Sequence, residues 1–372
     1  MSFWHGAERL VGDLALPATP GPHPVLLVVG GNGEQARDRS GWLDGLAQAG
    51  IATFSWDRPG RSATAGGRVR DDVRLRAREI LAAWEKLDCL SEVDTTEGAL
   101  VGWGTGGWAA AQAATFAGRA RAVVLLSTPM VSALQLAEHR LVLRLREHGL
   151  AADDVTCARE ALRERWYRLA DGLGVAQIAA DDGAHRDRPW FPLLPSADEM
   201  EAAASMVDPR PTLSGVTVPV LALYGEQDPL LPLEDCVRGV RLALRSAGHR
   251  DHQVEVVRGA DQGLRVRPGH GLGRLTDGRH QFGDWPAGLT EFIVSWLEGR
   301  IRRTVEMPSF APPVSMSCAE GLPTDRAPAD RFPAGAADTF APGPGAAPRR
   351  PEPDRPDHGP VPVRQVRRRL AR

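Results

Sequence analysis

The feature that most constrains the fold is an alternation of short apolar runs with helix-like segments over residues 1–304. The run His23 to Val29 (HPVLLVV), for example, is wholly apolar after its first residue and ends at glycine. A continuous apolar run of this kind is typical of a strand that is buried on both faces of a parallel sheet. Strands that alternate with helices indicate an α/β architecture. We therefore predict an α/β fold with a mostly parallel, doubly wound sheet.

The expected elements follow one another along the chain. Strands are predicted at 23–29, 51–56, 98–101, 122–127, 218–224 and 253–257, and helices at 41–50, 69–87, 108–116 and 289–302. In the second of these helices, Val73, Ile80, Leu81 and Trp84 recur at helical spacing, which predicts one buried face.

The alternation stops between residues 132 and 209. Helices are expected here at 134–148 and 155–173, followed by a loop that carries Trp190 and Phe191. A helical insert between strands of a parallel sheet is typical of a cap over the carboxyl ends of the strands, where ligands bind. We predict a core formed by 1–131 and 210–304 with a helical cap at 132–209.

The composition changes near residue 305. Residues 305–372 contain 14 prolines and few large apolar side chains, which cannot bury enough surface to form a core. We predict a disordered C-terminal tail at 305–372. Its last nine residues, RQVRRRLAR, carry five arginines. Two interpretations stay open: these arginines make a weak contact with nucleic acid or another acidic partner, or the tail is solvated and has no partner.

Charge and composition exclude several function classes. The net charge of −2 does not fit a globally basic nucleic-acid binder. No run of 18 apolar residues exists, and the N-terminal segment lacks the pattern of a secretory signal. The four cysteines are far apart and form no C-x-x-C pair, which disfavours a zinc site or a disulfide framework. We expect a cytoplasmic protein with reduced thiols, no metal, no cofactor and no membrane partner, whose oligomeric state is left open.

A glycine-rich turn carries the clearest chemical signal. The strand that ends at Val101 is followed by Gly102-Trp103-Gly104-Thr105-Gly106-Gly107 and then by an alanine-rich helix. A strand, a tight turn and a helix are the setting of the nucleophile elbow, G-x-S-x-G. The central position is Gly104, so the elbow has no hydroxyl group that could attack a substrate.

The acid and the base are expected after two later strands. The segment Leu223 to Pro229 (LYGEQDP) ends a strand and places Asp228 in the following loop, where it serves as the acid or simply as a loop-capping carboxylate. The segment VRGADQGL follows another strand and places Gln262 at the position of the base. A carboxamide cannot accept a proton from a hydroxyl group near neutral pH.

Residues 10–300 resemble an α/β-hydrolase, in particular the bacterial esterase and peptidase-like group with a helical cap. The resemblance rests on the loop VVGGNG (Gly30 to Gly33), the stretch WDRPGRS after the next strand, the elbow, the helical insert, and the acid and base segments. It implies the α/β-hydrolase fold. It also implies a degenerate triad, with Gly104 for serine and Gln262 for histidine, so the activity of the group does not carry over. We leave open whether His270 or His280 replaces the missing base.

The resemblance further implies what remains of the site. The backbone N–H groups of Gly31 and Thr105 would form an oxyanion hole, and Trp103 and Trp190 are candidate walls of a pocket, although ordinary core packing is the alternative for each tryptophan. The hypothesis is a protein that binds a carbonyl-containing small molecule and catalyses a non-hydrolytic step, such as an elimination, cyclisation or isomerisation. The alternatives are an inactive pseudoenzyme that acts as a binding or regulatory module, and a hydrolase with unorthodox catalytic residues.

Overall fold

A computed structural model of the chain describes residues 1–31, 42–57, 72–196, 199–200, 208–266, 285–286 and 288–301. Residues 305–372, predicted as a tail, lie outside the described residues. So do most of the WDRPGRS stretch and both His270 and His280. The predicted division into core, cap and tail therefore stays a prediction.

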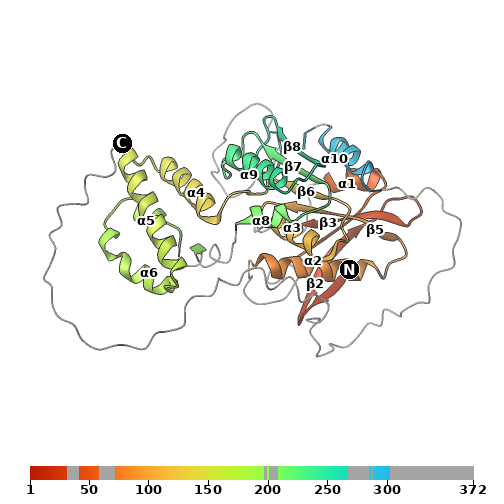
Figure 1. Cartoon of the computed structure of the whole chain (residues 1–372), viewed down its shortest axis with the longest axis horizontal. Helices are drawn as coiled ribbons and strands as arrows, with labels where there is room; N and C mark the ends of the chain where they lie inside the picture. The colour runs from red at the N-terminus through yellow and green to blue at the C-terminus, as the bar shows by residue number, and fades with distance from the viewer. Residues whose placement is uncertain are drawn as a thin grey trace. The chain divides into compact units, whose positions relative to one another are not determined.

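One eight-stranded sheet organises the described part of the chain, in the order β1-β2-β4-β3-β5-β6-β7-β8 (Figure 1). The strands are β1 (Ser2–His5), β2 (Glu8–Ala15), β3 (His23–Val29), β4 (Ala52–Trp56), β5 (Val93–Trp103), β6 (Val123–Leu126), β7 (Val220–Gly225) and β8 (His252–Val257). Strands β3 to β8 are parallel, and β1 and β2 pair antiparallel at one edge. The predicted mostly parallel sheet is confirmed, and the hairpin β1–β2 is an addition that the sequence analysis did not foresee.

Helices cover both faces of this sheet. They are α1 (Trp42–Gln48), α2 (Val73–Leu87), α3 (Gly106–Ala117), α8 (Pro209–Ser214), α9 (Leu233–Ser246) and α10 (Leu289–Glu298). Alternate residues of β3 belong to two different apolar clusters, because successive side chains of a strand point to opposite faces. Helices α2, α3 and α9 share one cluster with Leu27, and α1 and α10 share the other with Leu26. The doubly wound arrangement is therefore confirmed.

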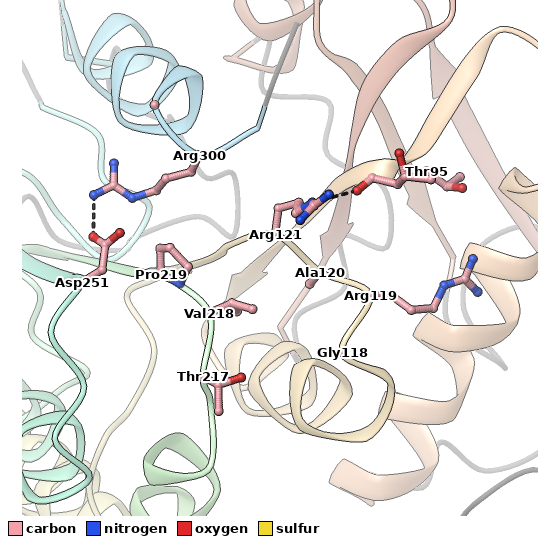
Figure 2. A pocket seen from close by; sticks show the side chains of 12 residues that line it. Thr95, Gly118, Arg119, Ala120, Arg121, Thr217, Val218, Pro219, Asp251 and Arg300 are labelled. Atoms are coloured by element: carbon pink, nitrogen blue, oxygen red, sulfur yellow. Dashed lines mark hydrogen bonds and ion pairs between the residues drawn. The ribbon is translucent and has the colours of Figure 1, made fainter. Parts of the chain in front are cut away.

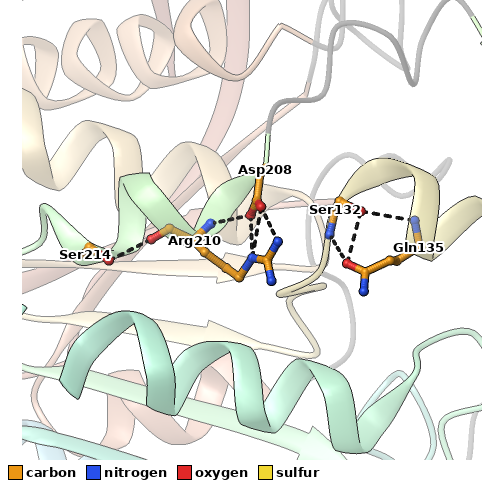
Figure 3. A network of polar contacts seen from close by, with 5 residues as sticks. All are labelled: Ser132, Gln135, Asp208, Arg210 and Ser214. Carbon is orange, nitrogen blue, oxygen red and sulfur yellow. Dashed lines mark hydrogen bonds and ion pairs between the residues drawn. The ribbon is translucent and has the colours of Figure 1, made fainter. Parts of the chain in front are cut away.

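A group of helices separates β6 from α8. It consists of α4 (Ala133–Glu147), α5 (Ala152–Ala170), α6 (Val175–Asp181) and the short turns η1 (Asp182–His185) and η2 (Phe191–Leu193). Capped helices stand at both of its borders, as Figure 3 shows. Ser132 and Gln135 form a reciprocal capping box at the start of α4, with the Gln135 N–H donating to Ser132 Oγ at 3.2 Å. At the start of α8, the N–H of Arg210 donates to Asp208 Oδ1 at 3.0 Å.

Candidate functional site

The turn between β5 and α3 has the conformation of an elbow. Gly104 has a φ of +53°, a left-handed value that costs other residues energy and that glycine adopts freely. Its N–H donates to the carbonyl oxygen of Leu126 on β6 at 2.8 Å, and its own carbonyl oxygen accepts from the Gly107 N–H at 3.0 Å. The turn is thus held by hydrogen bonds on both sides, with glycine at its centre.

A second glycine allows α3 to approach the end of β3. A Cβ atom on Gly106 would lie 2.3 Å from the carbonyl oxygen of Val29 and 2.5 Å from that of Gly30. Only glycine leaves room for this contact. It brings the chain after β3 beside the elbow, where Gly31 Cα lies 3.9 Å from the position of a Cβ on Gly104. The structure therefore brings together Gly31, Gly104 and Thr105, three of the predicted site residues.

Asp228 follows β7, as predicted, and is 7% exposed. Its Oδ1 accepts from the N–H of Leu230 at 2.8 Å, which is the loop-capping role considered above. Among the residues that the structure describes, Oδ2 has no hydrogen-bond partner. Burial raises the pKa of the Asp228 carboxyl from 3.8 to about 6, although two backbone hydrogen bonds and the charge of Arg140 act in the opposite direction.

Helix α4 contributes two residues near this carboxyl group that the sequence analysis did not single out. The Nε2–H of His139 donates to the carbonyl oxygen of Pro229, directly after Asp228, at 2.9 Å. Burial lowers the pKa of Arg140, whose charge in turn interacts favourably with Asp228. The predicted cap thus contacts the acid loop through one helix.

Gln262 lies in the loop after β8 and is joined to the elbow strand. The indole N–H of Trp103, the residue before Gly104, donates to the backbone oxygen of Gln262 at 3.3 Å. Trp103 also packs against Trp42 and Trp285, with ring centroids 6.3 and 6.2 Å away. An aromatic cluster therefore ties the elbow to the loop that holds the predicted base position.

Trp190 departs from the expected role as a pocket wall. It is 2% exposed and belongs to the apolar cluster within the helical insert, with Leu141, Leu145 and Leu162 among its members. A side chain that is enclosed in this way supports the packing of α4 and α5. We therefore assign Trp190 to the core of the insert, the alternative that the sequence analysis kept open.

A cavity of about 700 Å³ lies at the amino ends of the strands (Figure 2). Gly104 follows the carboxyl end of β5 and so lies at the opposite ends of the strands. Three arginines line it, and each has an acidic partner. Arg119 is paired with Asp88, Arg121 with Glu97, and Arg300 with Asp251. Their charges are largely compensated, so this cavity does not have the character of an anion site.

Metal ligands, membrane-spanning helices and cysteines can also be located in the described residues. No group of three or more metal-ligating side chains occurs in the described ranges. Within the same ranges, no helix is both long and apolar enough to cross a membrane. Cys157 and Cys236 are free. Burial raises the pKa of the Cys236 thiol to about 12.

No protein-family model matches the chain, and no curated protein matches it in sequence. Solved structures do match it. DcsB, in complex with its substrate analogue, is 15% identical with a TM-score of 0.52, and the match covers 82% of this chain and 99% of DcsB. Proline iminopeptidase of Mycobacterium smegmatis is 16% identical with a TM-score of 0.50, covering 81% of this chain and 98% of that one.

A hypothetical protein from Pseudomonas aeruginosa is similar to the same degree. It is 17% identical with a TM-score of 0.50, and the match covers 81% of this chain and 92% of that protein. Likeness at such low identity establishes fold and not activity. Together with the strand order, the elbow turn and the helices on both faces of the sheet, it shows that this chain has the α/β-hydrolase fold.

Proposed function

We propose that the chain binds a carbonyl-containing small molecule and moves a proton on it without forming a covalent intermediate. The carbonyl oxygen would accept from the N–H groups of Gly31 and Thr105, and the Asp228 carboxylate would serve as the general base. Elimination, cyclisation and isomerisation all include such a step, since each removes a proton while negative charge develops on oxygen.

The observation that carries this proposal is the unpartnered oxygen of Asp228. A buried polar atom normally has a hydrogen-bond partner, and one without a partner requires an explanation. Oδ2 of Asp228 has none among the described residues. A general base also works best with a pKa near the operating pH, and burial brings the pKa of this carboxyl to about 6.

The spacing of the strands supports a small ligand between the two parts of the site. Strand β6 separates the elbow strand β5 from the acid strand β7. Neighbouring strands lie about 4.8 Å apart, so their ends are separated by roughly 10 Å. In a Ser-His-Asp triad, a histidine bridges serine and aspartate. With Gln262 at the base position, we propose that part of the substrate bridges the same distance.

Proton exchange tests this proposal with simple carbonyl compounds in place of the natural substrate. Native protein is incubated in D2O with small ketones, thioesters and β-keto esters, and the loss of α-proton signals is followed by NMR. We expect catalysed exchange for at least one of these classes, with a rate that rises with pH through about 6 because the ionised carboxylate is the base.

Asp228→Asn should abolish this exchange. The matched control is Asp235→Asn, which removes an exposed carboxylate on α9 that pairs with Arg238. Exchange that persists in Asp228→Asn would contradict the assignment of the base. Saturable ester hydrolysis by the native protein would instead favour a hydrolase in which Asp228 activates water.

A binding or regulatory module without catalysis is the second candidate. The indole hydrogen bond from Trp103 to the backbone of Gln262 favours it, because this contact closes the region between the elbow and the base loop with aromatic side chains. Ligand binding that is retained in Asp228→Asn, together with no exchange by either protein, would select this candidate.

A further inference from the structure

A buried guanidinium group spans the two loops that meet at the elbow. Arg76 lies on α2 and is 3% exposed. Its Nη1 donates to Oγ1 of Thr105 at 3.3 Å, and its Nη2 donates to the carbonyl oxygen of Gly30. One planar fork therefore connects the end of β3 to the start of α3.

The bond to Gly30 has a consequence for Gly31. The carbonyl oxygen of Gly30 belongs to the same peptide unit as the Gly31 N–H. A trans peptide unit is planar, so its C=O and N–H point in opposite directions. When Arg76 holds the oxygen on one side, the N–H must point to the other. Arg76 thus sets the direction of one of the two amides that the proposed function assigns to the carbonyl oxygen.

The bond to Thr105 anchors the side chain of the residue that carries the other amide. Threonine at the start of a helix usually accepts a hydrogen bond from an N–H of the first turn, but Thr105 makes no such bond. Its hydroxyl accepts from Arg76 instead. The peptide unit that carries the Thr105 N–H is held as well, because the Gly107 N–H donates to the carbonyl oxygen of Gly104. Side chain and backbone of Thr105 are therefore both fixed.

We propose that Arg76 is the positioning residue for the carbonyl-binding amides of Gly31 and Thr105. In this role it acts through the Gly30–Gly31 peptide unit and the Thr105 hydroxyl rather than by contact with the ligand. A planar fork suits this task, because two acceptors are held at once in fixed directions, which an ammonium group on a flexible chain does not achieve. The inference rests on the proposed function, because that function assigns a carbonyl oxygen to the two amides. Whether Arg76 fixes the two amides can still be measured without any reaction.

The test uses backbone ¹⁵N relaxation of the full chain. Arg76→Gln removes the fork, and Arg74→Gln removes an exposed arginine of the same helix as the matched control. Rigid backbone has an order parameter of about 0.85 and flexible backbone less than about 0.6. We expect Gly31 to fall from the rigid to the flexible range in Arg76→Gln, with a smaller fall at residue 105, and neither to change in Arg74→Gln. Equal values in the two variants would overturn the proposal.

A second variant keeps the test decisive if Arg76→Gln does not fold. Thr105→Val keeps the shape of the side chain and removes the acceptor of Nη1, whereas Thr105→Ser keeps that acceptor. We expect greater mobility at residues 31 and 105 in the valine variant and native values in the serine variant. Native mobility in Thr105→Val would overturn the proposal.

Binding of 4-nitrophenolate separates this inference from the proposed function. The anion absorbs near 400 nm, and oriented N–H donors favour it over the neutral phenol. We expect native protein to bind the anion and Arg76→Gln to bind it about tenfold more weakly, as for the loss of about 1.4 kcal/mol of interaction. No binding by the native protein would count against the proposed carbonyl site, while the relaxation experiments would still decide the role of Arg76.

Discussion

The double substitution Gly104→Ser, Gln262→His tests whether the scaffold of a serine hydrolase persists around the missing groups. Among the residues that the structure describes, a Cβ atom at Gly104 would contact only Gly31 Cα, at 3.9 Å, so a serine fits the space that these residues leave. The remaining cost is the φ of +53°, about 1–2 kcal/mol for a residue other than glycine. That cost lowers the melting temperature by roughly 2–4 °C per kcal/mol. Asp228 keeps an unpartnered Oδ2 that could accept from an imidazole Nδ1–H.

Hydrolysis of 4-nitrophenyl esters and labelling by a fluorophosphonate measure the outcome. Loss of the nucleophile or of the base alone costs serine hydrolases about a millionfold in turnover. We therefore expect no enzymatic hydrolysis by the native protein or by either single variant, and measurable turnover with labelling only in the double variant. Saturable hydrolysis by the native protein that Asp228→Asn abolishes would refute this reasoning. Unfolding of Gly104→Ser would show that the turn is not an elbow with room for a side chain.

Three further substitutions test the packing and the electrostatics of the site. Gly106→Ala should destabilise the fold more than Gly104→Ala in urea, because its Cβ would lie 2.3 Å from a backbone oxygen; equal midpoints would contradict the close approach of α3. Trp190→Ala should lower the free energy of unfolding by about 3–5 kcal/mol, the cost of removing a core aromatic side chain. A much smaller loss of stability would instead favour a role for Trp190 in ligand binding. Because burial raises the pKa of Asp228 from 3.8 to about 6, its ionised form destabilises the fold above pH 6, and this penalty disappears as the pH falls below 3.8. Asp228→Asn should therefore be more stable than native protein at pH 8, by up to about 3 kcal/mol, and the difference should shrink towards pH 4; a constant difference in urea titrations would contradict the raised pKa.

The parallel strands could be predicted because burial on both faces leaves a direct mark in the sequence. The run of β3 matches its prediction at both ends, and β4, β6, β7 and β8 differ by one or two residues at an end. Strand β5 begins five residues earlier and ends two residues later than predicted. Helix α9 was missed although its signal is present. Its buried residues Cys236, Val240, Ala243 and Leu244 recur at helical spacing, with arginines on the opposite face. The hairpin β1–β2 carries a weaker signal, since an edge strand buries fewer of its residues.

The elbow could be predicted because its requirements are local. A left-handed φ and close backbone contacts can be met only by glycine at particular positions of a short turn, so the glycines themselves reveal it. Arg76 could not be distinguished by residue type, since Arg74 and Arg78 flank it in the same helix. Its position in the helix could have identified it. Arg76 lies four residues before Ile80 and eight before Trp84, on the buried stripe of α2. An arginine on an apolar stripe requires buried partners, and here they include Gly30 and Thr105 in the two loops of the site.

The stability of Asp228→Asn, measured together with its α-proton exchange and ligand binding, separates a working site from a remnant. A buried carboxylate without a partner destabilises the fold, and a chain that used this region only as a scaffold would be more stable with a neutral side chain there. Functional sites often retain groups that reduce stability, which produces a trade-off between stability and activity. A variant that gains stability and loses α-proton exchange would display that trade-off and support Asp228 as the general base. A variant that gains stability while ligand binding is unchanged would instead identify a binding module, in which the carboxylate serves to cap its loop, as in the bond from Leu230.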